Sequence, residues 1–143
     1  MRLLELFSGT GSVGNAFKDH GWEVISLDRD MAADIQTDIM DWDYTRSGYE
    51  PGDFDVIWSS PPCTEYSRAK SVGVRDIVGA NRVVERTWDI ITHFMAMFWF
   101  MQTGMLKDQV MMLLVPYTDV DYCKYGLESV SYTHLTLPTN REV

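Results

Sequence analysis

A glycine-rich turn between two apolar runs constrains the fold of this chain more than any other feature. Residues 3–7 form a short, mostly apolar run that ends at Ser8-Gly9-Thr10-Gly11, and apolar residues then recur at helical spacing as far as Gly21. A second apolar run at residues 23–27 is followed directly by Asp28. The pattern predicts a strand, a loop, a helix and a second strand, which together begin a β-α-β unit.

The spacing of the glycines predicts that this unit binds a nucleoside. Gly9, Gly11 and Gly14 follow the first strand and open the helix, where backbone N–H groups and the helix N-terminus approach a ligand closely. Asp28 lies 19 positions after Gly9, where a carboxylate that binds a ribose is expected. A dehydrogenase with NAD and a methyltransferase with S-adenosylmethionine both use this frame, so the motif leaves the cofactor open.

Further strands and helices alternate along the rest of the chain. They are expected at the following places: a weak helix and a loop in the aspartate-rich stretch from Asp30 to a turn at residues 48–52, a buried strand at residues 54–58, the longest helix at residues 76–97, a strand at residues 98–101, and one more at residues 110–115 or 119–123. This alternation predicts an α/β fold with a doubly wound, mostly parallel sheet, which binds ligands at the carboxyl ends of its strands.

The chain is strongly acidic, but its charge is unevenly distributed. With 143 residues, of which 45% are hydrophobic, it is expected to form one globular domain rather than a disordered polymer. The 21 acidic and 12 basic residues give a net charge of −9, and a uniformly acidic surface would repel nucleic acid. Residues 61–86, however, carry five bases and three acids, so a basic segment directly follows the third predicted strand.

Cysteine usage and hydropathy indicate a cytoplasmic protein without a metal or a membrane partner. Cys63 and Cys123 are too few for a disulfide framework, and their spacing does not suggest a metal site. The longest apolar run, residues 90–101, is interrupted and is shorter than the roughly 20 residues that span a bilayer. The N-terminal residues lack the pattern of a signal peptide.

The sequence Ser60-Pro61-Pro62-Cys63 directly follows the strand predicted at residues 54–58. Cys63 is therefore expected at the carboxyl edge of the sheet, beside the glycine loop, where a nucleophile could meet a bound cofactor. The two prolines fix the backbone and so restrict how the cysteine is presented. A half-buried structural cysteine is the alternative, but the position favours a nucleophile.

In order and spacing, these motifs resemble those of the cytosine-C5 DNA methyltransferase family. Residues 6–11 resemble its first cofactor motif, Asp28 the acidic residue that holds the ribose hydroxyls, and Asp38-Ile39 the pair that contacts the adenine. Pro62-Cys63 matches the dipeptide of the nucleophile. The likeness runs from residue 1 to about Gly126.

The resemblance implies a Rossmann-like methyltransferase domain, incomplete at the C-terminus, that uses S-adenosylmethionine and acts on a cytosine flipped out of double-stranded DNA. The implied cofactor-binding residues are Phe7, Ser8, Gly9, Thr10, Gly11, Asp28, Asp38, Ile39 and Pro61. The implied DNA-binding residues follow the nucleophile and are Ser67, Arg68, Lys70 and Arg75. A solvated positive helix face is the alternative interpretation of these charges.

The same resemblance implies covalent chemistry at Cys63. Its thiolate adds to C6 of cytosine, and C5 then attacks the methyl group of S-adenosylmethionine. The thiol needs a lowered pKa for this role, and Arg68, Lys70 or Arg75 could favour the anion if the fold brings them close.

Two regions depart from the pattern of the family. A Glu-Asn motif, whose glutamate binds and protonates N3 of the cytosine, is expected between Met101 and Gln102, and a short deletion there is the simplest explanation of its absence. Without this acid, turnover is expected to fall by about 10²–10⁴. The basic stretch expected after Gly126 is also missing, so a target-recognition domain is expected to be absent or to be supplied by a second chain.

The C-terminal residues resemble a translated sequencing adapter from about Ser129 onward. Residues 1–128 are therefore interpreted as a partial catalytic domain and residues 129–143 as a non-native tail, which is left out of the predicted fold. A genuine polar tail is the alternative.

Other functions stay open on the sequence alone. One is a non-catalytic fragment or subunit that binds S-adenosylmethionine, which the missing Glu-Asn favours. Another is an amino-methyltransferase that acts on nucleic acid, whose related motif has an aromatic residue in place of Cys63. RNA is an alternative substrate to DNA.

Overall fold

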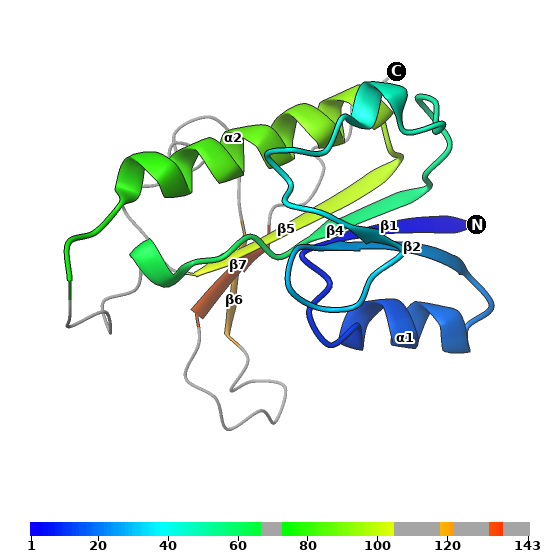
Figure 1. The fold of residues 1–143 in the computed structure, drawn as a ribbon. Coiled ribbons are helices and arrows are strands. Elements are labelled where there is room, and N and C mark those ends of the chain that lie inside the picture. Colours follow the sequence, from blue (N-terminus) through cyan, green and yellow to red (C-terminus); the bar gives the residue numbers. More distant parts are fainter. Residues whose placement is uncertain (67–72, 105–117, 122–131, 136–143) are drawn as a thin grey trace, which may run out of the picture.

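The computed structural model describes residues 1–66, 73–104, 118–121 and 132–135, and side chains as far as Met101. The strands are β1 (Arg2–Leu6), β2 (Glu23–Asp28), β3 (Ile35–Gln36), β4 (Val56–Ser59), β5 (Phe98–Gly104), β6 (Thr118–Asp121) and β7 (Tyr132–Leu135). The helices are α1 (Ser12–Asp19) and α2 (Ile77–Phe94), with short 3₁₀ turns at Tyr44–Arg46 and Thr64–Tyr66. Figure 1 shows their arrangement.

The strands form one sheet in the order β3-β2-β1-β4-β5-β7-β6. The first five are parallel, whereas β7 runs antiparallel to both β5 and β6. Leu6 at the end of β1 pairs with Leu27 on one side and Ser59 on the other. The carboxyl ends of β1, β2 and β4 therefore meet at one edge, as the sequence predicts for a ligand-binding sheet.

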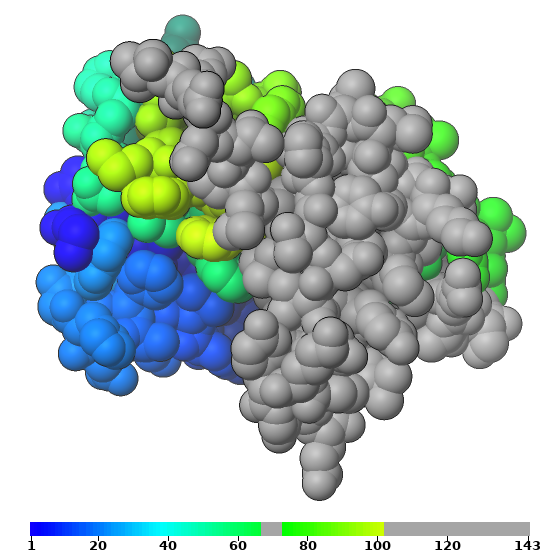
Figure 2. Space-filling model, turned by 180° about the vertical axis from the view of Figure 1, so that it is seen from behind, coloured from blue at the N-terminus to red at the C-terminus, as the bar shows by residue number. Residues whose placement is uncertain are grey.

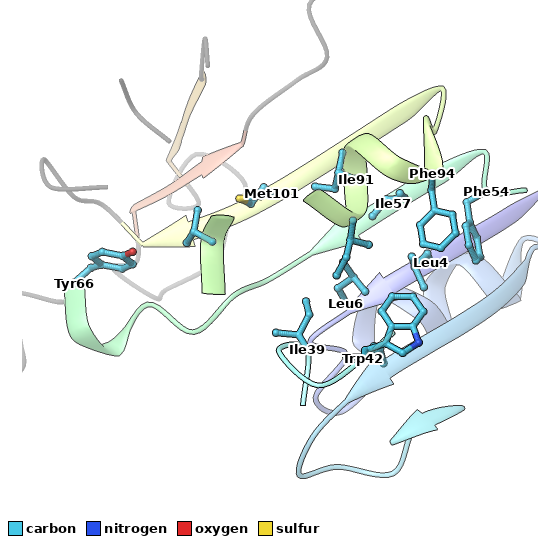
Figure 3. Packing of buried hydrophobic residues seen from close by; sticks show 13 residues of the cluster. Leu4, Leu6, Ile39, Trp42, Phe54, Ile57, Tyr66, Ile91, Phe94 and Met101 are labelled. Atoms are coloured by element: carbon cyan, nitrogen blue, oxygen red, sulfur yellow. The ribbon is translucent and has the colours of Figure 1, made fainter. Parts of the chain in front are cut away.

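The two helices cover opposite faces of the sheet (Figure 1). Successive side chains of β1 point to these two faces in turn. Leu4 and Leu6 join a buried cluster with residues of α2, and Figure 3 shows Phe94 of α2 in this cluster. Leu3 instead packs on the other face, where Val13 and Phe17 of α1 cover it. Seen from behind, the N-terminal residues form the blue surface in Figure 2. The predicted doubly wound α/β arrangement is confirmed.

The longest helix is confirmed, with ends that local chemistry explains. The Asp76 carboxylate accepts a hydrogen bond from the Gly79 N–H at 2.8 Å and so caps the start of α2. The helix ends at Phe94 because Met95 adopts a left-handed conformation with φ of +52°.

The prediction of a helix in the aspartate-rich stretch is wrong. This stretch contains β3 and the 3₁₀ turn Tyr44–Arg46 instead. Its carboxylates bind nearby backbone N–H groups: Asp34 accepts from Ser26 and Asp38 from Met40, both at 2.9 Å. Such bonds compete with helical hydrogen bonds and explain the difference.

The C-terminal elements differ partly from the expectation. The strand expected at residues 119–123 corresponds to β6, whereas the alternative at residues 110–115 lies outside the described residues. Residues 132–135, which the sequence interpretation leaves out of the fold, form β7 between β5 and β6. Tyr132 and Thr133 belong to residue types that favour strands.

Candidate functional site

The glycine loop lies between the ends of β1 and β2. Gly9 and Gly11 have φ of +53° and +73°, which glycine adopts without the strain other residues incur. The Ser8 N–H donates to the Leu27 carbonyl at 3.1 Å, and the Gly11 N–H to the Ser8 carbonyl at 2.8 Å. The structure thus brings the predicted cofactor residues 7–11 into one tight turn.

Phe7, Ser8 and Thr10 take different positions within this turn. Phe7 also has a positive φ, +60°, and packs against the cluster under α2. Ser8 is buried, whereas Thr10 is exposed and its Oγ1 lies 3.0 Å from Oγ of Ser12. A positive φ at a phenylalanine is a strained conformation that is typical of functional loops.

Asp28 is joined to the glycine loop. Its Oδ2 accepts the Gly9 N–H at 2.8 Å, and its Oδ1 accepts the N–H groups of Asp30 and Met31, both at 2.8 Å. Burial alone would raise the pKa of Asp28, but the three N–H bonds and the charge of Arg29 together hold it below the ordinary value. The carboxylate stays ionised and keeps about one of its four acceptor positions for a ligand hydroxyl.

Glu5 supports the other side of the loop, a role that the sequence interpretation missed. This residue is only 3% exposed, on the face of β1 that α1 covers, and accepts the backbone N–H groups of Val13 and Gly14. Gly11 caps α1 without a side-chain bond, so the Glu5 carboxylate satisfies N–H groups of the first turn. Burial raises the pKa of Glu5. The sequence signal that could have indicated this role is that Glu5 is the single acidic residue within the apolar run at residues 3–7.

Gly14 is required by this contact with Glu5. A Cβ at position 14 would overlap the Glu5 carboxylate and lie 3.1 Å from Cγ1 of Val24. The third glycine of the motif therefore allows α1 to pack closely on the sheet.

The Asp38-Ile39 pair lies in a turn beside Asp28. The Thr37 N–H donates to the Asp28 carbonyl at 3.1 Å, which places the pair next to the end of β2. Asp38 accepts hydrogen bonds from Met40 and Arg29, at 2.9 and 3.4 Å. Ile39 is buried and packs in the cluster shown in Figure 3. The three predicted residues Asp28, Asp38 and Ile39 are thus in one neighbourhood.

Cys63 follows the edge of the sheet in a short, fixed segment. The Ser60 N–H donates to the Leu6 carbonyl at 3.2 Å, which joins this segment to the end of β1. Pro61 is buried, whereas Cys63 is exposed and free. The predicted nucleophile is therefore exposed, three residues after the bond that joins this segment to the end of β1.

Tyr66 anchors the nucleophile segment to α2. Its N–H donates to the Cys63 carbonyl at 3.1 Å, and its hydroxyl donates to Oδ1 of Asn81 at 2.5 Å. The ring is 1% exposed, and burial raises the pKa of Tyr66 to about 12. The Asp76 N–H also donates to Glu65 at 2.7 Å. Figure 3 shows Tyr66 at the far end of the cluster from Phe54.

The predicted DNA-binding residues are described only in part. Ser67, Arg68 and Lys70 lie outside the described residues, whereas Arg75 is described and exposed. Their proximity to the Cys63 thiol stays a prediction.

Neither a metal centre nor a membrane span is found in the described part of the chain. No group of three His, Cys, Asp or Glu side chains there could hold a metal ion. None of its helices is both long and apolar enough to cross a bilayer.

A viral protein is similar to most of this chain. A protein of Frog virus 3 (isolate Goorha), named "Probable DNA (cytosine-5)-methyltransferase", is 32% identical over 142 residues. The similarity covers 88% of this 143-residue chain and 64% of that protein, so this chain spans less than two thirds of its relative. The alignment has 142 positions, whereas 88% of this 143-residue chain is fewer residues than that. The relative therefore has internal positions that this chain lacks. No family model matches the chain.

Solved structures share the fold. A protein described as a DNA modification methyltransferase encoded within an E. coli prophage has a TM-score of 0.67 at 14% identity, over 96% of this chain and 46% of that one. The PH0226 protein of Pyrococcus horikoshii OT3 has a TM-score of 0.53 at 11% identity, over 95% of this chain and 80% of that one. The bifunctional kinase-methyltransferase WbdD has a TM-score of 0.52 at 12% identity, over 94% of this chain and 34% of that one. The expected Rossmann-like fold of methyltransferases is confirmed.

Proposed function

Because this chain is a homologue of a DNA (cytosine-5)-methyltransferase and has a methyltransferase fold, we propose that it is the catalytic part of an S-adenosylmethionine-dependent enzyme that methylates C5 of cytosine in DNA. The observation that carries the proposal is the placement of Cys63. The exposed thiol follows Ser60, whose backbone is bonded to β1 directly before the glycine loop.

The residues of the glycine loop fit S-adenosylmethionine. A Cβ built on Gly9 would meet nothing within 4 Å, so the loop borders open space there. Asp28 has acceptor capacity for a ribose hydroxyl, and the turn at Asp38 and Ile39 lies beside it. We propose that Phe7 to Gly11, Asp28, Asp38, Ile39 and Pro61 hold the cofactor, which supplies the methyl group when bound.

Cys63 performs the covalent step in this proposal. The thiolate sulfur forms a bond to C6 of a cytosine flipped out of the duplex, and the electron pair of the C5–C6 double bond makes C5 nucleophilic. When the cofactor is bound, C5 would displace the methyl group from its sulfonium, which would leave as the neutral thioether. Loss of the C5 proton and departure of the Cys63 sulfur as thiolate would then restore the ring. Ser67, Arg68, Lys70 and Arg75 are proposed to hold the DNA near this segment.

The acid that assists the addition is missing from the expected place. Strand β5 continues directly from Met101 to Gln102, Thr103 and Gly104, so no Glu-Asn stands between Met101 and Gln102, where it is expected. Protonation of N3 would then depend on solvent, and we expect methyl transfer by this chain to be slow by about 10²–10⁴.

A non-catalytic protein that binds S-adenosylmethionine is the second candidate. The sequence Met101-Gln102 favours it, because the cofactor residues are all present while the acid partner of the nucleophile is not.

Covalent trapping on a duplex that contains 5-fluorocytosine tests the proposal. Fluorine at C5 cannot leave as the proton does, so an enzyme that adds through a thiolate stays attached to the DNA. With S-adenosylmethionine present, a variant with Glu-Asn inserted between Met101 and Gln102 is expected to form the adduct, and the unmodified chain to form it slowly.

The matched control is the same insertion variant with Cys63→Ser. Loss of the adduct in this control supports Cys63 as the nucleophile. An adduct that persists without Cys63, or methyl transfer that survives the substitution, would refute the assignment. Methyl transfer to RNA but not to DNA would change the proposed substrate.

A further inference from the structure

A turn of fixed backbone carries the Asp38-Ile39 pair. The Asp38 carbonyl accepts the N–H groups of Asp41 and Trp42, at 3.0 and 3.1 Å, and the Asp38 carboxylate accepts that of Met40. Ile39 and Trp42 are buried, at 3% and 7% exposure, and Figure 3 shows both inside the cluster under α2. Two apolar side chains thus attach the turn to the core, while Asp38 remains half-buried at its start.

Arg86 of α2 reaches this turn from a distant part of the chain. Its Nη2 donates to the Trp42 carbonyl at 2.7 Å and its Nε to the Ile39 carbonyl at 3.3 Å. The guanidinium carbon lies 4.6 Å from the centre of the Tyr44 ring, within the range of a cation–π contact. The Arg86 side chain therefore contacts residues 39–44 at two carbonyl groups and one aromatic ring.

The contact requires the shape of a guanidinium. Two donors on one rigid plane meet two carbonyls three residues apart, which a lysine ammonium on a flexible stem cannot reproduce with the same geometry. The bond from Arg86 is also the only hydrogen bond that the Ile39 carbonyl receives within the described residues. Without Arg86, this carbonyl beside a buried side chain would lose its partner.

We propose that Arg86 is a positioning residue that holds the Asp38-Ile39 turn in the shape that binds the adenine of S-adenosylmethionine, an inference that rests on the proposed function. Arg86 acts through the backbone of the turn. Its loss is therefore expected to weaken cofactor binding while the folded sheet remains.

The test compares Arg86→Met and Arg86→Lys with the unmodified chain. The dissociation constant for S-adenosylmethionine is measured by calorimetry, and hydrogen exchange of the Met40, Asp41 and Trp42 amides is measured without cofactor. Arg86→Met is expected to raise the dissociation constant about tenfold and Arg86→Lys by less, since hydrogen bonds to a charged donor are among the stronger ones. The three amides should exchange faster, whereas those of β1 and β2 should keep their rates.

Arg82→Met is the matched control, because Arg82 is exposed one turn earlier on the same helix. It should change neither measurement. An unchanged dissociation constant in Arg86→Met, or exchange that rises equally in β1 and β2, overturns the inference. If the unmodified chain fails to bind S-adenosylmethionine, the proposed function is wrong, and the exchange rates then decide the role of Arg86 alone.

Discussion

The two halves of the candidate site are built from different kinds of contact. On the cofactor side, backbone groups close the glycine loop, and the Asp28 carboxylate bonds directly to Gly9. On the nucleophile side, Cys63 is exposed, and its segment is joined to β1 by the Ser60 backbone and to α2 by the side-chain pair Tyr66 and Asn81. The cofactor side is thus held in shape by hydrogen bonds within the chain, whereas the nucleophile is presented on a short turn. Substitutions in one half should therefore spare the other.

Gly14→Val should have the largest effect on the cofactor side. The added side chain overlaps the Glu5 carboxylate and crowds Val24, so α1 must move away from the sheet. We expect a loss of about 1–3 kcal/mol in the free energy of unfolding, as for other overpacked sites, and the loss of S-adenosylmethionine binding. Urea titration and calorimetry measure the two effects.

Ala16→Val is the control for this variant, because Ala16 is an exposed residue of the same helix. It should cost less than about 1 kcal/mol, in line with helix propensity. A Gly14→Val protein with an unchanged unfolding midpoint would contradict the packing described for the glycine motif.

Tyr66→Phe should have an intermediate effect, confined to the nucleophile side. The substitution removes the hydroxyl and leaves Oδ1 of Asn81 without its donor, which costs about 1 kcal/mol of unfolding free energy. The affinity for S-adenosylmethionine should not change. Tyr49→Phe serves as control, since the Tyr49 hydroxyl makes no hydrogen bond within the described residues. If Tyr66→Phe weakened cofactor binding as much as Gly14→Val does, the two halves would not be separable.

Glu5→Gln should have the smallest effect, visible in the dependence of stability on pH. Burial raises the pKa of Glu5 above its ordinary value of 4.5, so the folded chain binds this proton more readily than the unfolded chain. The resulting stabilisation is complete below the ordinary pKa and is lost as pH rises through the raised value. The unmodified chain should therefore gain stability relative to Glu5→Gln as pH falls from about 7 to about 4.

The control for this titration is Glu50→Gln, at an exposed position. As a substitution at an exposed site, it should change the free energy of unfolding at pH 7 by no more than about 0.5 kcal/mol. A difference between Glu5→Gln and the unmodified chain that does not vary with pH would mean that Glu5 does not titrate as described.

The part of the site that lies close together in the sequence could be predicted. Gly9, Gly11 and Asp28 belong to one β-α-β unit, whose glycine spacing follows from backbone geometry that few other residues adopt. The buried strand before Cys63 could be predicted in the same way, from the apolar run that ends at Ser59. The resemblance to the cytosine-C5 DNA methyltransferase family, drawn from these residues, is confirmed by the viral relative.

Contacts between distant residues could not be predicted. Arg86 binds carbonyls 44 and 47 positions away, and neither its helix nor the turn carries a pattern that pairs them. Glu5 was overlooked since an apolar run tolerates one polar residue without an evident role. The helix predicted in the aspartate-rich stretch is not formed, because side-chain hydrogen bonds, such as the one that the Asp34 carboxylate accepts from the Ser26 N–H, outweigh a weak helix propensity.

Calorimetric titration of the unmodified chain with S-adenosylmethionine and, separately, with NAD shows which cofactor the site prefers. Both molecules contain an adenosine that could use Asp28, so only the rest of the site distinguishes them. We expect S-adenosylmethionine to bind more tightly than NAD and Asp28→Asn to weaken this binding about tenfold, since a charged acceptor is lost. Tighter binding of NAD would contradict the assignment to methyl transfer.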